Sequence, residues 1–172
     1  IKGIYKFSQG GKAKLRVQLM GAGTILNEVR EAAQILKETY SVESDIWSLT
    51  SVNEITREGQ QVDRWNLLHP ESKPKRAYLT EQLEGAEGPV VIATDYMKNY
   101  AEQMRKYIDQ PLTVLGTDGF GRSDSREALR SFFEVDRYFI TVAALKALAD
   151  QGSIKHSVVS DAIKSFGIDP EK

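Results

Sequence analysis

Leu112-Thr-Val-Leu115 runs directly into Gly116-Thr-Asp-Gly-Phe-Gly-Arg-Ser-Asp-Ser-Arg126, and a helical pattern opens at Arg126. The first four residues are mostly apolar, which is typical of a strand buried inside a parallel sheet. The three glycines that follow within six residues allow the backbone a positive φ or a close approach to a neighbour. A strand therefore passes to a helix through a sharply specified loop. In open α/β sheets, contacts with ligands and partners gather at this edge.

Strands and helices alternate along the chain on either side of this loop. Apolar runs and period-two patterns predict strands, whereas apolar residues at helical spacing predict the helices between them. Because four strands alternate with helices, we expect one α/β domain over residues 1–172. We expect a three-layer sandwich, with a mostly parallel sheet and helices on both faces. The predicted strands are 15–20, 46–50, 90–94 and 112–115. The predicted helices are 25–40, one that follows the 51–54 capping box and stops at His69-Pro70, a short one over 78–83, one with the apolar stripe Met97, Tyr100, Ala101, Met104 and Ile108, one that opens at Arg126, one from Asp136 to near Gly152, and one from about Lys155 to Phe166.

The segment that precedes the first core strand is open to two interpretations. Residues 3–8 alternate apolar and polar side chains, and a Ser-Gln-Gly-Gly turn follows at 8–11. This pattern fits the first strand of a hairpin with residues 15–20, and it equally fits a separate lead-in strand.

Short polar residues and one glycine predict where several helices begin and end. Thr24, Asp95 and Asp124 are candidate N-caps, because their side-chain oxygens can accept from the first free amides of a helix. Ser51-Val-Asn-Glu54 matches a capping box, and Gly167 suits the position just after the last helix.

Composition excludes several classes of function. The chain has 172 residues, is 41% hydrophobic and 27% charged, and carries a formal net charge of −1. This balance predicts no general attraction to nucleic acid or to an anionic membrane. There is no cysteine, so disulfides and a cysteine nucleophile are excluded, and the composition is compatible with the cytosol. No apolar run approaches the ~18 residues of a membrane span. Because the chain begins Ile-Lys-Gly rather than with Met, we expect a fragment of a longer protein.

The other candidate sites have simpler structural interpretations. Gly21-Ala-Gly23 lies between a strand and a helix, but Leu26 occupies the third glycine position of the dinucleotide fingerprint. A glycine turn that packs the helix close to the sheet explains this stretch better than nucleotide binding. His69 and His156 have no further ligand at metal-binding spacing, so we expect surface or capping roles. Ser123 does not lie in a G-x-S-x-G elbow.

The two tryptophans, Trp47 and Trp65, are interpreted as core or interface residues.

The glycine-rich loop itself remains open to three interpretations. In the first interpretation, the loop is an anion site in which Arg122 and Arg126 act beside the start of a helix. In the second, it is a docking surface for another domain or chain. In the third interpretation it is a self-contained turn whose aspartates pair with its arginines. The candidate contact residues are Gly116, Asp118, Gly119, Phe120, Gly121, Arg122, Asp124 and Arg126.

Seven stretches together resemble the C-terminal domain of the homodimeric bacterial pyruvate dehydrogenases, a thiamine-diphosphate-dependent family related to the transketolases. The loop block is the most specific, followed by the Trp-Asn-Leu-Leu-His-Pro block, and the resemblance runs essentially end to end. The stretches are Lys2-Gly-Ile-Tyr5, Val17-Gln-Leu-Met-Gly-Ala-Gly-Thr-Ile-Leu26, Val29-Arg-Glu-Ala-Ala33, Arg64-Trp-Asn-Leu-Leu-His-Pro70, Ala93-Thr-Asp-Tyr-Met-Lys98, Leu115-Gly-Thr-Asp-Gly-Phe-Gly-Arg-Ser-Asp-Ser-Arg126 and Phe133-Glu-Val-Asp136.

The resemblance implies a transketolase C-terminal fold, in which one strand of the sheet is antiparallel, and a role in dimer assembly. It also implies a cytoplasmic parent enzyme that decarboxylates pyruvate with thiamine diphosphate and magnesium and transfers the acetyl group to the lipoyl group of dihydrolipoyl acetyltransferase. The implied partners are the other domains of the same chain, the second subunit of a homodimer and that acetyltransferase, with no nucleic acid or membrane.

This sequence departs from the pattern of the whole enzyme in its cofactor motif. The family motif is Gly-Asp-Gly followed by Asn-Asn, but Gly116-Thr-Asp-Gly119 does not match it and no asparagine follows Asn99. We therefore expect no cofactor, metal or catalytic residue in this fragment. The competing hypothesis is a free-standing α/β domain that binds an anionic small molecule at a helix N-terminus. An excised domain should expose an apolar patch where its neighbours were, whereas a free-standing module should not.

Overall fold

A five-stranded sheet runs through the molecule in the computed structural model, which describes residues 2–172. The strands lie in the order β1-β3-β2-β4-β5, and every neighbouring pair is parallel except β1 with β3. This is the predicted mostly parallel sheet with one antiparallel strand. The strands are β1 (Ile4–Ser8), β2 (Leu15–Ala22), β3 (Val42–Leu49), β4 (Val90–Ala93) and β5 (Leu112–Leu115).

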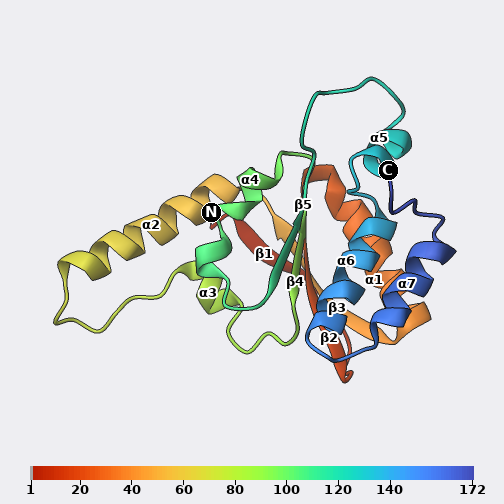
Figure 1. Cartoon of the computed structure of the whole chain (residues 1–172). Coiled ribbons are helices and arrows are strands. Elements are labelled where there is room, and N and C mark those ends of the chain that lie inside the picture. Colours follow the sequence, from red (N-terminus) through yellow and green to blue (C-terminus); the bar gives the residue numbers. More distant parts are fainter. Residues whose placement is uncertain (1) are drawn as a thin grey trace.

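Helices cover both faces of this sheet, as Figure 1 shows. One face packs against α1, α6 and α7, and the opposite face packs against α2, α3 and α4. The α-helices are α1 (Leu26–Tyr40), α2 (Val52–Leu68), α3 (Tyr78–Gln82), α4 (Lys98–Glu102), α5 (Arg126–Phe132), α6 (Arg137–Asp150) and α7 (His156–Ser165), and the short 3-10 turns are η1 (Gly23–Ile25) and η2 (Arg105–Tyr107).

Alternation along the strands divides the core into two layers. In β2, Val17 and Leu19 point into the layer under α1 and α6, whereas Met20 points into the layer under α2 and α3. All three side chains are fully buried, because the central strand of a parallel sheet is covered on both faces. Gln18 of β2 is polar but fully buried. Its amide accepts from the indole Nε1 of Trp47 at 2.9 Å and donates to the carbonyl of Glu87 at 2.9 Å.

The N-terminal segment is a lead-in strand, so the hairpin interpretation was wrong. β1 pairs with β3 and not with the strand that follows it in the chain. β3 begins at Val42, four residues earlier than predicted. The prediction started the strand too late because Asp45 interrupts the apolar pattern of the sequence. The Asp45 carboxylate lies within the sheet, where it pairs with Lys6 at 3.0 Å and with Arg16 at 2.6 Å.

The predicted helix over residues 97–108 is broken into α4 and η2. Ala101, Met104 and Tyr107 are buried at a spacing of three residues, and backbone hydrogen bonds of the i to i+3 type link them. A spacing of three matches a 3-10 turn rather than the 3.6-residue period of an α-helix. Of the predicted apolar stripe, Ala101, Met104 and Ile108 are buried, but Met97 is exposed, and the predicted type of helix was wrong.

Two predicted helix ends are confirmed and three predicted caps are wrong. The Ser51 hydroxyl accepts from the Glu54 amide at 3.2 Å, and Gly167 takes a φ of 65° just after α7. Thr24 lies inside η1, and α1 begins without a side-chain cap. Asp95 does not cap α4, and Ser125 rather than Asp124 caps α5 through the Ala128 amide.

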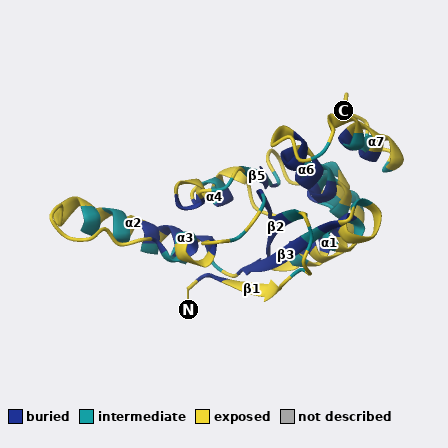
Figure 2. Ribbon diagram, turned by 90° about the horizontal axis from the view of Figure 1, so that it is seen from below, coloured by how far each residue is buried: buried dark blue, intermediate teal, exposed yellow. Residues whose placement is uncertain are grey.

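The second half of α2 extends away from the sheet as an arm, which is clear in both Figure 1 and Figure 2. Val52, Ile55, Thr56 and Gly59 in the first half are buried, whereas no residue after Gly59 in this helix is buried. The chain then returns to the body through residues 69–77.

Candidate functional site

The glycine-rich loop rises from the carboxyl end of β5 and arches over the edge of the sheet before it enters α5 (Figure 1). The strand order reverses beside β2, because β3 lies on one side of it and β4 on the other. The residues that follow β2, β4 and β5 therefore meet at one place. Binding sites in open α/β sheets form at such a switch point.

The base of the loop is fixed to the segment that follows β4. The Thr117 amide donates to the Tyr96 carbonyl at 2.9 Å, and the Thr117 hydroxyl donates to the Asp95 carbonyl at 2.6 Å. Gly116 permits this contact, since a Cβ there would lie 2.7 Å from the Tyr96 oxygen. The first glycine of the loop is thus required for a close backbone approach.

Asp118 provides the cap that the sequence assigned to Asp95. Its carboxylate accepts from the Lys98 amide, the first residue of α4, at 3.0 Å. Its second oxygen lies 3.9 Å from the Lys98 ammonium. A carboxylate from a distant segment therefore stabilises the start of α4, where the helix dipole favours negative charge.

The tip of the loop points into solvent. Phe120 is 96% exposed, and Gly119 beside it has a φ of 92°, a conformation that favours glycine. Tyr96 and Met97 at the base of the loop are exposed as well. These three large apolar side chains lie on neighbouring segments at the carboxyl edge.

The arginines of the loop have no acidic partner within residues 2–172. The Arg122 guanidinium lies 3.9 Å from the ring centre of Phe132, and neither Arg122 nor Arg126 forms an ion pair among the described residues. Asp124 accepts from the Ser125 amide at 2.7 Å instead. The self-contained turn, in which aspartates and arginines of the loop pair with one another, is therefore wrong.

A recess of about 360 Å³ lies under the loop at the switch point. Arg122, Arg126 and Arg130 line it, and Asp95 is the acidic residue that faces them. Its floor is apolar, with side chains from η1, α5 and the segment before α6. The recess thus combines an apolar floor with a surplus of positive charge, which suits a carboxylate-bearing partner.

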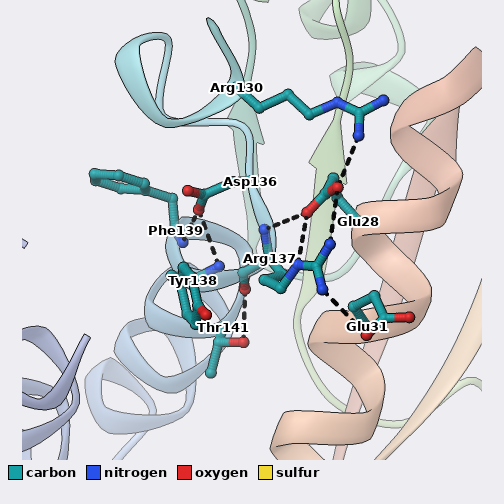
Figure 3. Close-up of polar contacts among 8 residues, drawn as sticks. All are labelled: Glu28, Glu31, Arg130, Asp136, Arg137, Tyr138, Phe139 and Thr141. Atoms are coloured by element: carbon teal, nitrogen blue, oxygen red, sulfur yellow. Dashed lines mark hydrogen bonds and ion pairs between the residues drawn. The ribbon is translucent and has the colours of Figure 1, made fainter. Parts of the chain in front are cut away.

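A buried carboxylate behind this recess holds three helices together (Figure 3). Glu28 of α1 is only 4% exposed, and its two oxygens accept from both flanking arginines. Arg130 of α5 donates at 2.8 Å, the Arg137 Nε donates at 2.9 Å and the Arg137 backbone amide donates at 3.1 Å. Arg137 also reaches Glu31 at 3.2 Å. This network fixes the position of α5, and with it the exit of the loop.

The ionisation of Glu28 follows from these contacts. Burial alone would raise the pKa of this carboxyl, but the hydrogen bonds from Arg137 and the positive charges of Arg137 and Arg130 outweigh burial. The pKa of Glu28 therefore lies below its ordinary value, and the carboxylate is ionised at neutral pH.

Asp136 at the start of α6 shows the opposite shift. Burial raises its pKa, and the nearby negative charge of Glu28 adds to this effect. Hydrogen bonds from the Phe139 and Tyr138 amides, both at 3.0 Å, oppose the rise in pKa but do not cancel it. Asp136 serves as the N-cap of α6.

Sequence reasoning identified the loop but missed Glu28, Arg130 and Arg137. The sequence did contain a sign that Glu28 faces the core. Glu28 lies three residues after Ile25 and one before Val29, and both of these side chains are buried in the layer under α1. A carboxyl group at a core-facing position needs a compensating cation. Which cation compensates it depends on the packing of α5 and α6, more than 100 residues further along the chain.

The remaining sequence candidates have structural roles. A Cβ on Gly21 would lie 2.7 Å from the Leu26 Cα, so this glycine lets α1 pack close to β2, as the turn interpretation proposed. His69 and His156 are exposed, and His156 pairs with Asp150 at 3.0 Å. No group of three or more His, Asp or Glu side chains within residues 2–172 is arranged to hold a metal ion. Among the same residues, no helix is long and apolar enough to cross a membrane.

The sheet order, the antiparallel edge strand and the two helical layers define an α/β domain of the transketolase C-terminal type. A family model described as the transketolase-like TK C-terminal domain matches residues 3–136. The chain belongs to this family, and the resemblance identified from the sequence is confirmed.

The chain is also similar to curated relatives over its whole length. It is 55% identical to the pyruvate dehydrogenase E1 component of Pseudomonas aeruginosa over 174 residues, which cover 100% of this chain and 20% of the relative. It is 52% identical to the protein of the same name from Escherichia coli K12 over 99% of the chain and 19% of that relative. The chain therefore spans about one fifth of the length of these relatives, and it matches their C-terminal part.

Solved structures support the fold independently. A split-gene transketolase, described as an inactive beta4 tetramer, superimposes with a TM-score of 0.58 at 18% identity, covering 87% of this chain and 43% of that one. Transketolase from Leishmania mexicana gives a TM-score of 0.54 at 16% identity, covering 85% of this chain and 18% of that one. At such low identity, these similarities establish the fold alone.

Proposed function

We propose that residues 1–172 form the C-terminal assembly domain of a cytoplasmic pyruvate dehydrogenase E1 component. In this proposal the parent enzyme decarboxylates pyruvate with thiamine diphosphate and magnesium. It then transfers the acetyl group to the lipoyl group of dihydrolipoyl acetyltransferase. The observation that carries the proposal is the 55% identity that extends over the whole chain.

The residues of this chain do not fit the cofactor. The described part of the chain holds no cluster of three potential metal ligands, and the sequence lacks the Gly-Asp-Gly and Asn-Asn pair of the family motif. We therefore propose that thiamine diphosphate and magnesium bind in the remainder of the parent and that this fragment supplies no catalytic residue. Calorimetric titration of the chain with cofactor and magnesium should give no heat of binding. A stoichiometric micromolar isotherm would contradict this assignment.

The loop of residues 116–126 is the proposed contact element between this domain and the rest of the homodimer. Phe120 is exposed at its tip, and Arg122 and Arg126 have no acidic partner within residues 2–172. Planar guanidinium groups bind carboxylates through two donors at once, and exposed aromatic residues anchor protein interfaces. The loop therefore offers the chemistry of an interface rather than that of a reaction centre.

The test is Arg122→Ala combined with Arg126→Ala in the full-length enzyme, with Arg105→Ala as a control. Arg105 is exposed, pairs with Glu102 at 2.6 Å and donates to the Leu112 carbonyl at 3.3 Å. If the loop arginines are buried in the assembly, the double variant should weaken dimerisation by about 3–5 kcal/mol, whereas the control should cost less than ~1 kcal/mol. Lost activity should recover at high protein concentration. A collapse of turnover with dimerisation and cofactor affinity intact would place the loop in the chemistry and refute the proposal.

A further inference from the structure

The second half of α2 and the segment that returns from it form an arm that extends away from the sheet. Among the described residues, the last hydrogen bonds and ion pairs from α2 to the body are made by Asp63, whose carboxylate accepts from the Tyr107 hydroxyl at 2.9 Å and pairs with Lys106 at 2.6 Å. The following residues, Arg64 to Lys75, extend beyond the sheet and are here called the arm tip. Figures 1 and 2 show the arm from two directions at a right angle, and it stands away from the sheet in both.

The arm tip has a defined shape despite its exposure. Asn66 closes it with two hydrogen bonds to the backbone of Lys75, at 2.8 and 2.9 Å. The rings of Trp65 and His69 stack with centres 4.4 Å apart, and the Lys75 ammonium lies 4.1 Å from the centre of the Trp65 ring. Two chain segments are thereby held together without a hydrophobic core. The side chains of the tip are presented in a preformed arrangement.

The arm tip also presents apolar side chains to solvent. Leu67 is 77% exposed and Leu68 is 54% exposed, and both lie at the last turn of α2. Two adjacent exposed leucines at the end of a projecting helix form an apolar patch that folding of this chain does not bury. Such patches mark interaction surfaces in soluble proteins.

The charges around these leucines indicate the chemistry of the partner. Arg64, Lys73 and Lys75 are the Lys and Arg residues between positions 64 and 75, and Glu71 is the single acidic residue there. The chain as a whole carries a net charge of −1, so the arm tip is positive on a slightly negative molecule. A complementary surface therefore has an apolar recess with acidic side chains at its rim.

The size of the patch favours a partner within the same polypeptide. A stable contact between separate protein molecules buries about 1,200–2,000 Å² in total, which is more than one helical turn and its return segment provide. A contact between linked domains forms at a high effective concentration, so a small anchor is sufficient. The relatives are about five times longer than this chain, which covers 20% of one and 19% of another.

We propose that the arm tip docks its two leucines into an acid-rimmed apolar recess on another domain of the same longer polypeptide. This inference rests on the proposed function, because it takes the chain as one domain of an E1-type protein. It adds a second interaction surface, separate from the loop of residues 116–126 at the carboxyl edge of the sheet.

The test uses the full-length protein with a photo-crosslinking amino acid at position 67. Isotopically light and heavy subunits are mixed into dimers before illumination, and cross-linked peptides are identified by mass spectrometry. We expect cross-links from position 67 to another domain, with light peptides joined only to light and heavy only to heavy. The same probe at Gln151, an exposed residue at the end of α6 on the opposite helical layer, should give no such product.

Two outcomes would overturn the inference. Light–heavy products would assign the contact to a second copy, and a cross-linking yield at position 67 no higher than that at position 151 would show no specific contact.

As a second measurement, Leu67→Asp with Leu68→Asp should accelerate proteolytic release of this domain at least tenfold. Gln60→Asp with Gln61→Asp, exposed positions earlier in the same helix, should leave the release rate unchanged. An unchanged rate in the leucine variant would also contradict docking.

The proposed function has its own readout in the same preparation. Cofactor-dependent decarboxylation of pyruvate by the unmodified full-length protein tests the enzyme assignment, and the cross-link position tests the docking. If the protein does not decarboxylate pyruvate, the cross-link position still tests the docking, and if no cross-link forms, the decarboxylation assay still tests the enzyme assignment.

Discussion

Replacing Glu28 with glutamine should destabilise the fold more than any other single exchange in the polar network of Figure 3. Glu28 is 4% exposed and accepts four hydrogen bonds, one from Arg130 and three from Arg137. Glutamine has nearly the same shape, but it loses the charge and presents an amide group as a donor to one guanidinium. Arg130 is then left without a counter-charge, and Arg137 keeps only its contact with the exposed Glu31.

The expected magnitude follows from the exposure of those cations. Breaking a buried ion pair by removing one partner costs about 3–5 kcal/mol. The side chains of Arg130 and Arg137 are 19% and 37% exposed, so water recovers part of the loss. We therefore expect a loss near the lower limit, about 3 kcal/mol of unfolding free energy, or a fall in Tm of about 6–12 °C for a domain of this size.

The matched control is Glu31→Gln on the same helix. Glu31 is exposed and makes one contact of 3.2 Å with Arg137, so its loss should cost less than ~1 kcal/mol. Urea unfolding of both variants and of the unchanged chain measures the difference. Equal and small losses in the two variants would refute the conclusion that Glu28 holds α5 and α6 in place.

The same comparison has a defined dependence on pH. The pKa of folded Glu28 lies below its ordinary value of 4.5, so its stabilising contribution is fully present above about that pH. The contribution is lost as the pH falls through the lower, folded pKa. The difference in stability between the unchanged chain and Glu28→Gln should therefore be constant near neutrality and shrink below pH 4.5. A difference that does not shrink on acidification would contradict the assigned ionisation.

Two further predictions concern the opposite face of the sheet. Trp47→Phe removes the only donor within residues 2–172 to the buried Gln18 Oε1, and the unsatisfied acceptor should cost about 1–3 kcal/mol in urea unfolding. An unchanged urea midpoint would show that another donor replaces the indole. Tyr107 should ionise at unusually high pH, because burial and the hydrogen bond and charge of Asp63 raise its pKa from 10.0 to about 12. Absorbance titration of tyrosinate measures the pKa of Tyr107, and Asp63→Asn should lower that pKa. If Asp63→Asn leaves the pKa of Tyr107 unchanged, the whole shift is due to burial.

Much of the fold could be predicted from local sequence patterns. The continuous apolar run at β4 indicates a strand covered on both faces, and the helical spacing from Ile25 onward indicates α1. Ser51 and Gly167 mark helix ends through interactions that lie within one helical turn. These features depend on neighbours close in sequence, so a pattern is sufficient to find them.

The errors arose where a distant segment changes the local preference. The Asp45 carboxylate enters β3 because Lys6 and Arg16, from two other strands, neutralise it. Asp118 rather than Asp95 stabilises the start of α4, since the loop after β5 folds back to that helix. No local pattern contains these pairings.

The sequence alone determined the family, the layered α/β architecture and the position of the glycine-rich loop, because these depend on period, turn chemistry and a specific run of residues. Only the tertiary structure placed Glu28 between Arg130 and Arg137, left Arg122 and Arg126 without acidic partners among residues 2–172, and carried Leu67 and Leu68 beyond the sheet. The physical reason is the same in each case. Whether a charge is compensated or an apolar side chain is buried depends on which surfaces folding brings together, and the distances between those surfaces are set by the packing of the whole chain.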